Sequence, residues 1–519
     1  MTPILFIIIE LLPLADFPDS TRPGDERILY LALPMPILTL DPYEYSYGAQ
    51  NEIFPFIYSF LLVPNRDGTF SPDLAMRWTS SDHDLTWEFI LRPEARFHNN
   101  RPVLATDVAY SLKKIFQYNV ILAEAVDRIE TPYPHRVILH LKHRVPHLLY
   151  QLSVESIVPE PLPEVPDLDE QPIGSGPFRV LSRLDDRQII LARFDQYYGT
   201  PPNWDSIEIN YVPSEEKIWR DLMLERTYFS ENISAENVPY LHVEPGRYEL
   251  EGRLSNKATV LLFNTHRPPL ADRDIRKSLA RMIDLEEHIR NDLRGMAKPC
   301  PGPLGFQSPY LPADVDQVRP DWAWAEKTLE GKGWVDHDGD GYRDRDGQNL
   351  DFDILLSPHF DADRKTADYV QLAFNQFGVR ANLIEKRYDR MIEENLKTGD
   401  FQACFTWHNT NHRLVNGFVR TWASGAKGDF NYGRYQNPAV DQSLSELPTK
   451  DNEEDYSKIL RTFHQQLVND QPAVWLVHNY IIHGHSGRLQ GYTRPNPEFY
   501  PTYHLIHAWL APRPTHWKY

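Results

Sequence analysis

An acidic segment, Asp336-His337-Asp338-Gly339-Asp340-Gly341, has the residue types and spacing of a calcium-binding loop. Such a loop takes its first oxygen ligands from alternate acidic side chains, and a glycine makes the sharp turn between them. The twelfth position normally holds a bidentate Glu, whereas this chain has Gly347 there. Asp336, Asp338 and Asp340 are therefore a weak candidate for a structural calcium site, and an acidic hairpin without an ion is the alternative.

Cys404, His408 and His412 recur at intervals of four residues, which would place three transition-metal ligands on one face of a helix. The segment that ends at Trp407 has a strand-like pattern, however, so we do not expect the helical spacing to be realised. A polar loop at the end of a strand is the preferred interpretation.

The sequence shows no recognisable catalytic motif. Gly174-Ser175-Gly176 lacks the spacing of a hydrolase nucleophile turn and is followed directly by Pro177, which favours a plain turn. No phosphate-binding loop, dinucleotide fingerprint or HExxH pattern occurs. Since no nucleophile, base and orienting group can be grouped, we expect neither an enzyme nor a cofactor.

Strand-like and helix-like segments alternate along the chain, which is the pattern of an α/β fold. The run 257–264 is almost continuously apolar, so that strand should be buried on both faces. A Pro- and acid-rich stretch, 158–171, favours extended backbone and predicts a connector between two units. Strands are expected at 85–91, 136–141, 257–264, 350–356, 380–384, 401–407 and 473–482.

The chain has 519 residues with 54 basic and 73 acidic side chains, which leaves a formal net charge of -19. At about 150 residues per core, this length predicts roughly three packed units. The acidic surface would repel the phosphates of nucleic acids and of anionic lipids, so neither is an expected partner. Cys300 and Cys404 form no CxxC pair, and we expect two free, partly buried thiols, a single bridge being the alternative.

The N-terminal residues 1–27 are expected to be a degenerate signal segment followed by a linker. Their apolar run, 4–15, has about the length of a signal-peptide apolar region and is too short to span a bilayer of about 30 Å. No Lys or Arg precedes this run, and Glu10 interrupts it. An apolar tail on a cytosolic chain is therefore the alternative.

An ordered series of short motifs resembles the family 5 extracellular solute-binding proteins, the receptors of bacterial oligopeptide, dipeptide and nickel ABC importers. Each motif is weak alone, but their order and spacing extend from about residue 28 to the end of the chain. The motifs are Leu40-Asp41-Pro42, Pro72-Asp73-Leu74-Ala75 with Trp78, Gly174-Ser175-Gly176-Pro177-Phe178, Phe263-Asn264-Thr265, Asp274-Ile275-Arg276-Lys277-Ser278-Leu279 and Tyr435-Gln436-Asn437-Pro438.

The fold implied by this resemblance is an α/β, two-lobed periplasmic-binding-protein fold of type II with an additional subdomain in the first lobe. Because the chain crosses between the lobes more than once, closure should be a hinge motion about the crossings. On this chain, lobe I would take residues 28–45, 170–258 and 480–519, the subdomain 46–169, and lobe II 259–479.

In the peptide-binding members of the family, a tryptophan packs on the ligand and an acid three residues later pairs with the ligand's amino terminus. Trp407 matches that tryptophan, but no carboxylate follows between His408 and Arg413. Burying an unpaired ammonium is costly, so a free-amine peptide needs an acid from elsewhere, such as Glu44. Alternatively, the ligand lacks that amine or carries an anionic group. The candidate ligand-binding residues are Trp407, His408, Asn409, Arg413, Glu44 and Tyr47.

The resemblance implies the substrate-binding component of an ABC importer, which traps a peptide or peptide-like solute and delivers it to a membrane permease. It also implies a periplasmic or cell-envelope location and a monomer. Family 5 domains serve as sensors in transcription regulators too, so a cytosolic or periplasmic ligand sensor acting through a partner protein is the alternative. Only about 27 residues precede the first expected strand, so we expect no fused helix-turn-helix domain.

Overall fold

The computed structural model describes residues 27–44, 50–65, 67–161, 167–231, 233–241, 246–312, 318–357, 361–425, 428–450, 452–492 and 504–511. The expected export signal and Tyr47 lie outside these residues. No helix within the described ranges is long and apolar enough to cross a membrane.

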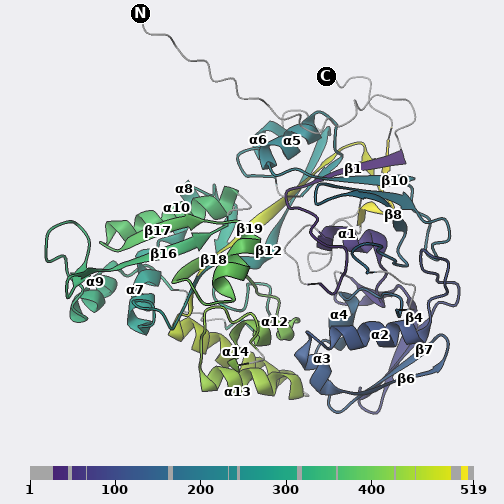
Figure 1. Cartoon of the computed structure of the whole chain (residues 1–519), viewed down its shortest axis with the longest axis horizontal. Coiled ribbons are helices and arrows are strands. Elements are labelled where there is room, and N and C mark those ends of the chain that lie inside the picture. Colours follow the sequence, from purple (N-terminus) through teal and green to yellow (C-terminus); the bar gives the residue numbers. More distant parts are fainter. Residues whose placement is uncertain are drawn as a thin grey trace, which may run out of the picture.

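One mixed sheet of 11 strands runs through the molecule (Figure 1). Its strands are β1 (Ile28–Leu33), β8 (Phe178–Leu184), β9 (Gln188–Arg193), β10 (Ser206–Tyr211), β11 (Phe229–Ser230), β12 (Tyr248–Phe263), β13 (Ala297–Pro299), β16 (Asp351–Leu356), β17 (Arg380–Glu385), β18 (Ala403–Asn409) and β19 (Ala473–Ser486). Their order is β17-β16-β18-β12-β19-β11-β1-β10-β9-β8, with β13 paired to β19. Lobe I holds the β11 to β8 end of the sheet, and lobe II holds the β17 to β18 end.

The long strands β12 and β19 connect the two lobes (Figure 1). They pair antiparallel on both sides of an irregularity in which residues 255–257 leave the ladder, between the pairs Leu254–Tyr480 and Ala258–His478. An irregular stretch of this kind absorbs backbone rotation without unzipping the rest of the ladder. We propose that it is the hinge, and the expected lobe borders at 258/259 and 479/480 fall beside it.

Helices cover both faces of the sheet in lobe II. The C-terminal half of β12 turns Leu261 and Phe263 towards one helical layer and Val260 and Leu262 towards the other, because successive strand residues point to opposite faces. This confirms the expected strand that is buried on both sides. The helices of lobe II are α7 (Arg273–Met282), α8 (Leu285–Asn291), α9 (Trp322–Gly331), α10 (Asp361–Gln376), α11 (Tyr388–Arg390), α12 (Val415–Trp422), α13 (Pro438–Glu446) and α14 (Glu453–Asp470).

The subdomain has a sheet of its own, in the order β4-β5-β7-β6. Its elements are β2 (Leu62–Pro64), β3 (Phe70–Pro72), β4 (Ala75–Ser81), β5 (Thr86–Leu91), α2 (Ala105–Ile115), α3 (Val120–Ala125), β6 (Val126–Tyr133), β7 (Arg136–Leu141) and α4 (Leu148–Ser153). The preceding helix α1 (Gln50–Ile57) packs instead in the core of lobe I, where Phe56 contacts Phe178. We therefore propose that the subdomain begins near Ser59, which bridges to Ile157, rather than at residue 46.

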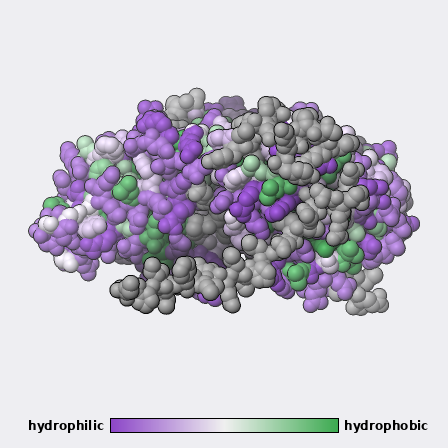
Figure 2. Space-filling view, turned by 90° about the horizontal axis from the view of Figure 1, so that it is seen from above, coloured by the Kyte–Doolittle hydropathy of each residue, from purple (hydrophilic) through white to green (hydrophobic). Residues whose placement is uncertain are grey.

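The remaining elements of the described chain are short. Lobe I also carries α5 (Glu215–Met223) and α6 (Val238–Leu241). In addition there are two small two-stranded sheets. One pairs β14 (Asp344–Arg345) with β15 (Gln348–Asn349), and the other pairs β20 (Leu489–Gln490) with β21 (Trp509–Leu510). Hydrophilic residues dominate the face seen from above, with only small hydrophobic groups among them (Figure 2). The apolar residues thus lie mainly in the cores, as the composition predicts.

Candidate functional site

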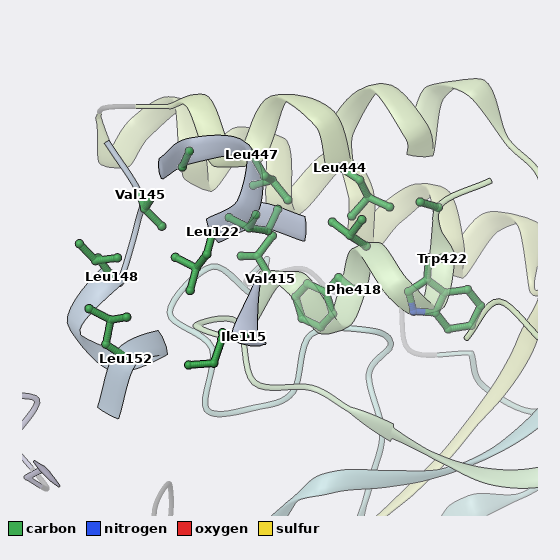
Figure 3. Packing of buried hydrophobic residues seen from close by; sticks show 14 of the residues in the cluster. Ile115, Leu122, Val145, Leu148, Leu152, Val415, Phe418, Trp422, Leu444 and Leu447 are labelled. Carbon is green, nitrogen blue, oxygen red and sulfur yellow. The ribbon is translucent and has the colours of Figure 1, made fainter. Parts of the chain in front are cut away.

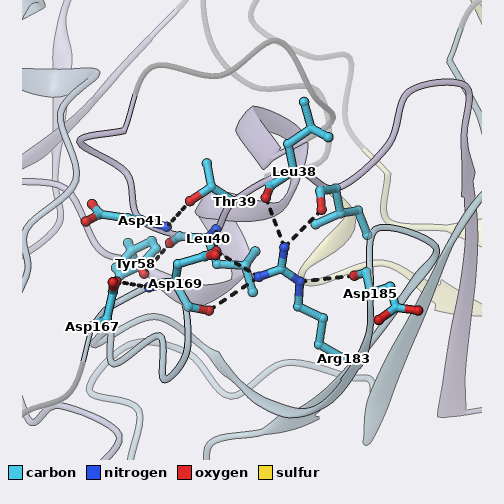
Figure 4. A network of polar contacts seen from close by, with 10 residues as sticks. Leu38, Thr39, Leu40, Asp41, Tyr58, Asp167, Asp169, Arg183 and Asp185 are labelled. Carbon is cyan, nitrogen blue, oxygen red and sulfur yellow. Dashed lines mark hydrogen bonds and ion pairs between the residues drawn. The ribbon is translucent and has the colours of Figure 1, made fainter. Parts of the chain in front are cut away.

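The loop that follows β1 is held in place by the guanidinium group of Arg183 (Figure 4). Arg183 donates to the carbonyls of Ile37, Leu38 and Asp185 and to the carboxylate of Asp169, with a distance of 2.7 Å to that carboxylate. The same carboxylate accepts the N–H of Leu40 at 2.6 Å. The loop carries Tyr43, whose hydroxyl donates to the Ser156 carbonyl of the subdomain at 2.8 Å, so this network helps to fix where the loop meets the subdomain.

Replacing Arg183 by Ala should lower the free energy of unfolding by about 2–4 kcal/mol, because several charge-assisted hydrogen bonds disappear together. Arg187→Ala is the matched control, since that exposed side chain pairs only with Asp185 among the described residues. The control should change stability by less than about 0.5 kcal/mol. Urea unfolding of both variants checks this expectation, and equal losses would contradict the role given to Arg183.

The subdomain contacts lobe II through an apolar cluster and one amide clamp. Leu122 and Leu148 of the subdomain face Val415 and Leu447 of lobe II (Figure 3). Beside them, the Asn416 side chain accepts the Val120 N–H and donates to the Tyr118 carbonyl, both at 3.0 Å. The subdomain and lobe II therefore touch directly.

A cavity of about 510 Å³ lies between the subdomain and lobe II, next to this contact. The Arg413 guanidinium lies 5.3 Å from the centre of the Tyr150 ring, and the Asn411 amide donates to the Tyr150 hydroxyl at 3.0 Å. The subdomain supplies Trp87, Arg144, His147 and Tyr150 among the lining residues, and lobe II supplies Tyr310, His412, Arg413, Lys450, Glu453 and Tyr456.

Two imidazole rings meet across the cavity wall. The rings of His147 and His412 make an edge-to-face contact with centroids 5.7 Å apart. Burial lowers the pKa of His147 to about 4 and that of His412 to about 3, so both rings are neutral at pH 7. The charges of the lining come from arginine, lysine and acidic side chains, and the aromatic rings fill the space between them. Such a lining suits a solute with polar ends and apolar parts.

The structure gives different surroundings to the predicted ligand residues on β18 and in the loop after it. Arg413 lines the cavity. Trp407 is half-buried, packs on Tyr388 with ring centroids 5.7 Å apart, and donates its indole N–H to Asp363. Asn409 is exposed, and its side-chain oxygen accepts the backbone N–H of Asn411.

The prediction that His408 contacts ligand is wrong for this structure. Its ring is 4% exposed and lies among Phe418, Trp422 and Trp475, on the face of β18 opposite to Trp407. Its Nε2 lies 3.1 Å from the Pro303 carbonyl. Burial lowers the pKa of His408 to about 4, so the residue is a neutral core histidine. Successive strand residues point to opposite faces, so Trp407 and His408 cannot share one site.

Two acids that the sequence did not single out have pKa values raised by burial. Asp363 accepts the Thr259 hydroxyl at 2.9 Å and the Trp407 indole N–H at 3.2 Å, and burial raises its pKa to about 6. Glu155 accepts the Tyr118 hydroxyl at 2.6 Å, and burial raises its pKa to about 7. Glu44, the acid proposed from the sequence, is exposed on the loop after β1.

The acidic loop at 336–341 does bring three carboxylates together. Ligand atoms of Asp336, Asp338 and Asp340 lie within 4.8 Å of one another, and all three side chains are exposed. The carboxylates already accept backbone N–H groups of the loop, as Asp336 does from Gly339 and Gly341. These turns account for the acidic residues without an ion, so the calcium site stays a weak prediction.

The helical spacing of the second candidate metal site, Cys404, His408 and His412, is not realised. Cys404 and His408 belong to a strand, and His412 lies in the loop after it. Burial raises the pKa of both Cys300 and Cys404 above the usual range of a thiol. Both cysteines are free and buried, which confirms the expectation of two unbridged thiols.

Residues 69–430 match the family described as bacterial extracellular solute-binding proteins, family 5 Middle. The oligopeptide-binding protein AppA of Bacillus subtilis is 22% identical over 503 residues, which is 89% of this chain and 88% of AppA. The nickel-binding periplasmic protein of Escherichia coli is 22% identical over 494 residues, 91% of this chain and 92% of that protein. The HTH-type transcriptional regulator SgrR of Yersinia pestis is 31% identical over 222 residues, but this is 43% of the present chain and 37% of the regulator.

Solved structures share the fold over nearly their whole length. AppA of Bacillus subtilis in complex with a nonapeptide has a TM-score of 0.83 at 21% identity, covering 93% of this chain and 99% of AppA. NikZ of Campylobacter jejuni in complex with Ni(L-His) has a TM-score of 0.83 at 19% identity, covering 93% and 99%. The α/β, two-lobed fold of the type II periplasmic binding proteins is thereby confirmed.

Proposed function

The chain belongs to the bacterial extracellular solute-binding proteins of family 5, and on that premise we propose that it is the substrate-binding component of an ABC importer. It traps a peptide or peptide-like solute between its lobes and delivers it to a membrane permease. The observation that carries this proposal is the cavity whose walls come from the subdomain and lobe II. The hinge proposed in β12 and β19 would let these two bodies separate.

The solute class is inferred from the chemistry of the cavity. Arg413 and Arg144 offer guanidinium groups that suit a carboxylate, while Tyr150, Tyr310 and Tyr456 offer ring faces and hydroxyls. Peptides combine such charged ends with apolar side chains and hydrogen-bonding backbone. Water in a roomy pocket can complete the contacts that a particular side chain leaves unmade. The relative AppA, matched over most of its length, is named as an oligopeptide-binding protein.

We assign Trp407 to the wall of the ligand space and Arg413 to an anionic group of the solute. Asn409 and Glu44, both exposed, are assigned as further polar contacts of the solute in this proposal. Tyr47 remains a prediction from the sequence. In this proposal the protein acts as a monomer, catalyses no reaction and works at the cell envelope.

Native mass spectrometry of the purified chain, followed by denaturation and identification of the released small molecules, tests the proposal directly. A co-purified peptide and a decrease in the radius of gyration when that peptide is added back are the expected results. The chain purifying without any solute, together with scattering curves that peptide mixtures leave unchanged, would contradict it.

Replacing Trp407 by Ala should weaken peptide binding at least tenfold, because a buried aromatic wall contributes roughly 1.5–3 kcal/mol to an interface. Isothermal titration with the co-purified peptide measures the change. Trp322→Ala is the matched control, since this tryptophan is 51% exposed on α9 and should leave affinity unaltered. Unchanged affinity in a folded Trp407→Ala protein would remove Trp407 from the site.

The alternative, a ligand sensor acting through a partner protein, has weaker support. The regulators that resemble this chain match 43% of it, whereas the oligopeptide- and nickel-binding proteins match about nine-tenths. Cell fractionation separates the two proposals, because an importer component is recovered from the envelope and a cytosolic sensor is not.

A further inference from the structure

His147 and His412 meet where the subdomain touches lobe II. His147 directly precedes α4 of the subdomain, and His412 lies in the loop after β18 of lobe II. Their rings make the edge-to-face contact at the wall of the cavity, and both residues line it. Because the two rings belong to different bodies, this contact is lost whenever the subdomain and lobe II separate.

Aromatic rings surround the histidine pair. The centroid of the Tyr456 ring lies 6.0 Å from that of His147, and the centroid of the Tyr310 ring lies 5.2 Å from that of His412. His412 is 5% exposed, and the buried Nε2 of His147 makes no hydrogen bond among the described residues. The pair is therefore packed against neutral side chains, where a positive charge is poorly stabilised.

The charged group beside the pair also disfavours its protonation. Arg413 follows His412 in the chain and lies over the Tyr150 ring on the same cavity wall. Burial is the main reason why the pKa of His147 is lowered to about 4, the charge of Arg413 adds to the effect, and Glu453 opposes it. Burial, followed by His147 and Arg413, lowers the pKa of His412 to about 3.

The other charged side chains of the lining offer the pair no buried counter-charge. Arg144 forms an ion pair with Asp84 on the subdomain. Lys450 lies 3.5 Å from Glu446 in lobe II. Glu453 is exposed in the first turn of α14, so water and salt weaken its attraction for a charged ring. Of the two acids that line the cavity, one is thus paired with an arginine and the other faces solvent.

We propose that His147 and His412 form a pH-sensitive contact that controls release of the solute from the cavity. At neutral pH the uncharged rings pack together and keep the subdomain against lobe II. In acid the protonated rings repel each other and Arg413, so the two bodies separate. For the solute this inference rests on the proposed function, to which it adds a means of regulation.

The direction follows from proton binding by the two arrangements. When the bodies separate, water reaches both rings and their pKa returns towards the ordinary value of about 6.5. The separated arrangement then binds protons below pH 6.5 that the touching arrangement does not. Between pH 7 and pH 5.5 each ring should shift the equilibrium towards separation nearly tenfold, and both rings together by roughly fiftyfold.

Double electron–electron resonance between two spin labels tests the contact without a solute. Asp127→Cys on β6 and Lys458→Cys on α14 provide exposed label positions on the two bodies, and the native thiols are buried. The ratio of the label distance found in this structure to longer distances should fall at least tenfold between pH 7 and pH 5.5. Far-ultraviolet circular dichroism verifies that the chain stays folded over this range.

Histidine variants assign the effect to the pair. His147→Phe combined with His412→Phe should keep the short label distance at both pH values, because phenylalanine supplies a ring that cannot be protonated. His266→Phe, at an exposed position of lobe II, is the matched control and should respond to pH as wild type does. If the double variant does not fold, His412→Phe alone decides, since it should reduce the response from roughly fiftyfold to about tenfold or less.

Three results would overturn the proposal. These are long label distances in wild type already at pH 7, a short distance that persists unchanged at pH 5.5, and a response of the histidine variants as large as that of wild type.

Isothermal titration with trialanine separates this inference from the proposed function. The charges of trialanine change little between pH 7 and pH 5.5. Wild type should bind it at least tenfold more weakly at pH 5.5, and the double variant should lose less than threefold. Equal affinity of wild type at both pH values would overturn the inference and leave peptide binding intact. Label distances that respond to pH without any binding of trialanine would contradict the peptide-binding function and leave the histidine contact intact.

Discussion

Lowering the pH from 7 to 5 should reduce the free energy of unfolding by several kcal/mol. The cause is a set of histidines buried as neutral rings, each no more than 5% exposed. Burial lowers the pKa of His412 to about 3 and the pKa of the other four to about 4. These histidines are His408, His412, His464, His478 and His483.

The sign follows from proton binding by the two states. Above pH 6.5 each of these rings is neutral whether the chain is folded or unfolded, so it leaves the stability unchanged. Below pH 6.5 the unfolded chain binds protons that the folded chain cannot, and the loss continues until the pH reaches the folded pKa near 4. At about 1.4 kcal/mol per pH unit, each histidine costs about 2 kcal/mol at pH 5.

Three buried acids oppose this loss. The pKa values of Asp73, Glu155 and Asp363 are raised to about 6, 7 and 6, so the folded chain binds their protons first as the pH falls. Together they return about 5 kcal/mol between pH 7 and pH 5, against about 10 kcal/mol lost at the five histidines. The net effect of these histidines and acids on lowering the pH from 7 to 5 is therefore a loss of stability.

Urea unfolding at pH 7, 6 and 5 measures this dependence. His464→Leu should reduce the dependence of the free energy of unfolding on pH by the equivalent of about one proton bound on unfolding. The reason is that the His464 ring is 2% exposed and its Nδ1 makes no hydrogen bond among the described residues. His266→Leu, at an exposed position, should retain the wild-type dependence. If His464→Leu has the same slope as wild type, buried histidines are not the cause.

Replacing Arg276 by Met should lower the free energy of unfolding by about 3–5 kcal/mol. The Arg276 side chain is 5% exposed and donates to four backbone carbonyls. Two of these carbonyls, Asp470 and Gln471, end α14, and the other two, Leu270 and Ala271, precede α7. Methionine fills a similar volume but donates no hydrogen bond, so the four carbonyls, two of them in fully buried hydrogen bonds, lose this partner.

Arg273→Met is the matched control on the same helix. Arg273 is exposed and reaches Asp470 at 3.5 Å, a surface ion pair worth less than about 1 kcal/mol. Guanidinium unfolding followed by far-ultraviolet circular dichroism measures both variants. Similar losses at the two positions would show that the carbonyl contacts of Arg276 contribute little.

Local patterns predicted the secondary structure well where one face of a segment is apolar. The seven expected strands are present, because alternation and apolar runs reflect burial that each strand experiences along its own length. The N-terminal half of β12, 248–254, was missed: Tyr248, Leu250 and Leu254 do alternate with charged residues, but Gly252 interrupts the apolar positions. Its pairing with β19 joins residues more than 200 positions apart.

The candidate site was predicted only in part. The sequence predicted Trp407, His408 and Arg413 as ligand residues, and Arg413 does line the cavity. It could not reveal the aromatic neighbours that bury His408, because they lie far away in the chain. Nor could it find Glu155 or Asp363. No motif marks either acid, and their raised pKa values arise from burial by residues distant in the chain.

The sequence by itself thus determined the α/β class, the family and the free thiols, because these depend on local patterns and on ordered motifs. Only the tertiary structure decided which side chains line the cavity between the subdomain and lobe II, how β12 pairs with β19 and which histidines and acids are buried. Those properties depend on which distant strands pair and which helices cover them, and the resulting burial determines where a charge is stable.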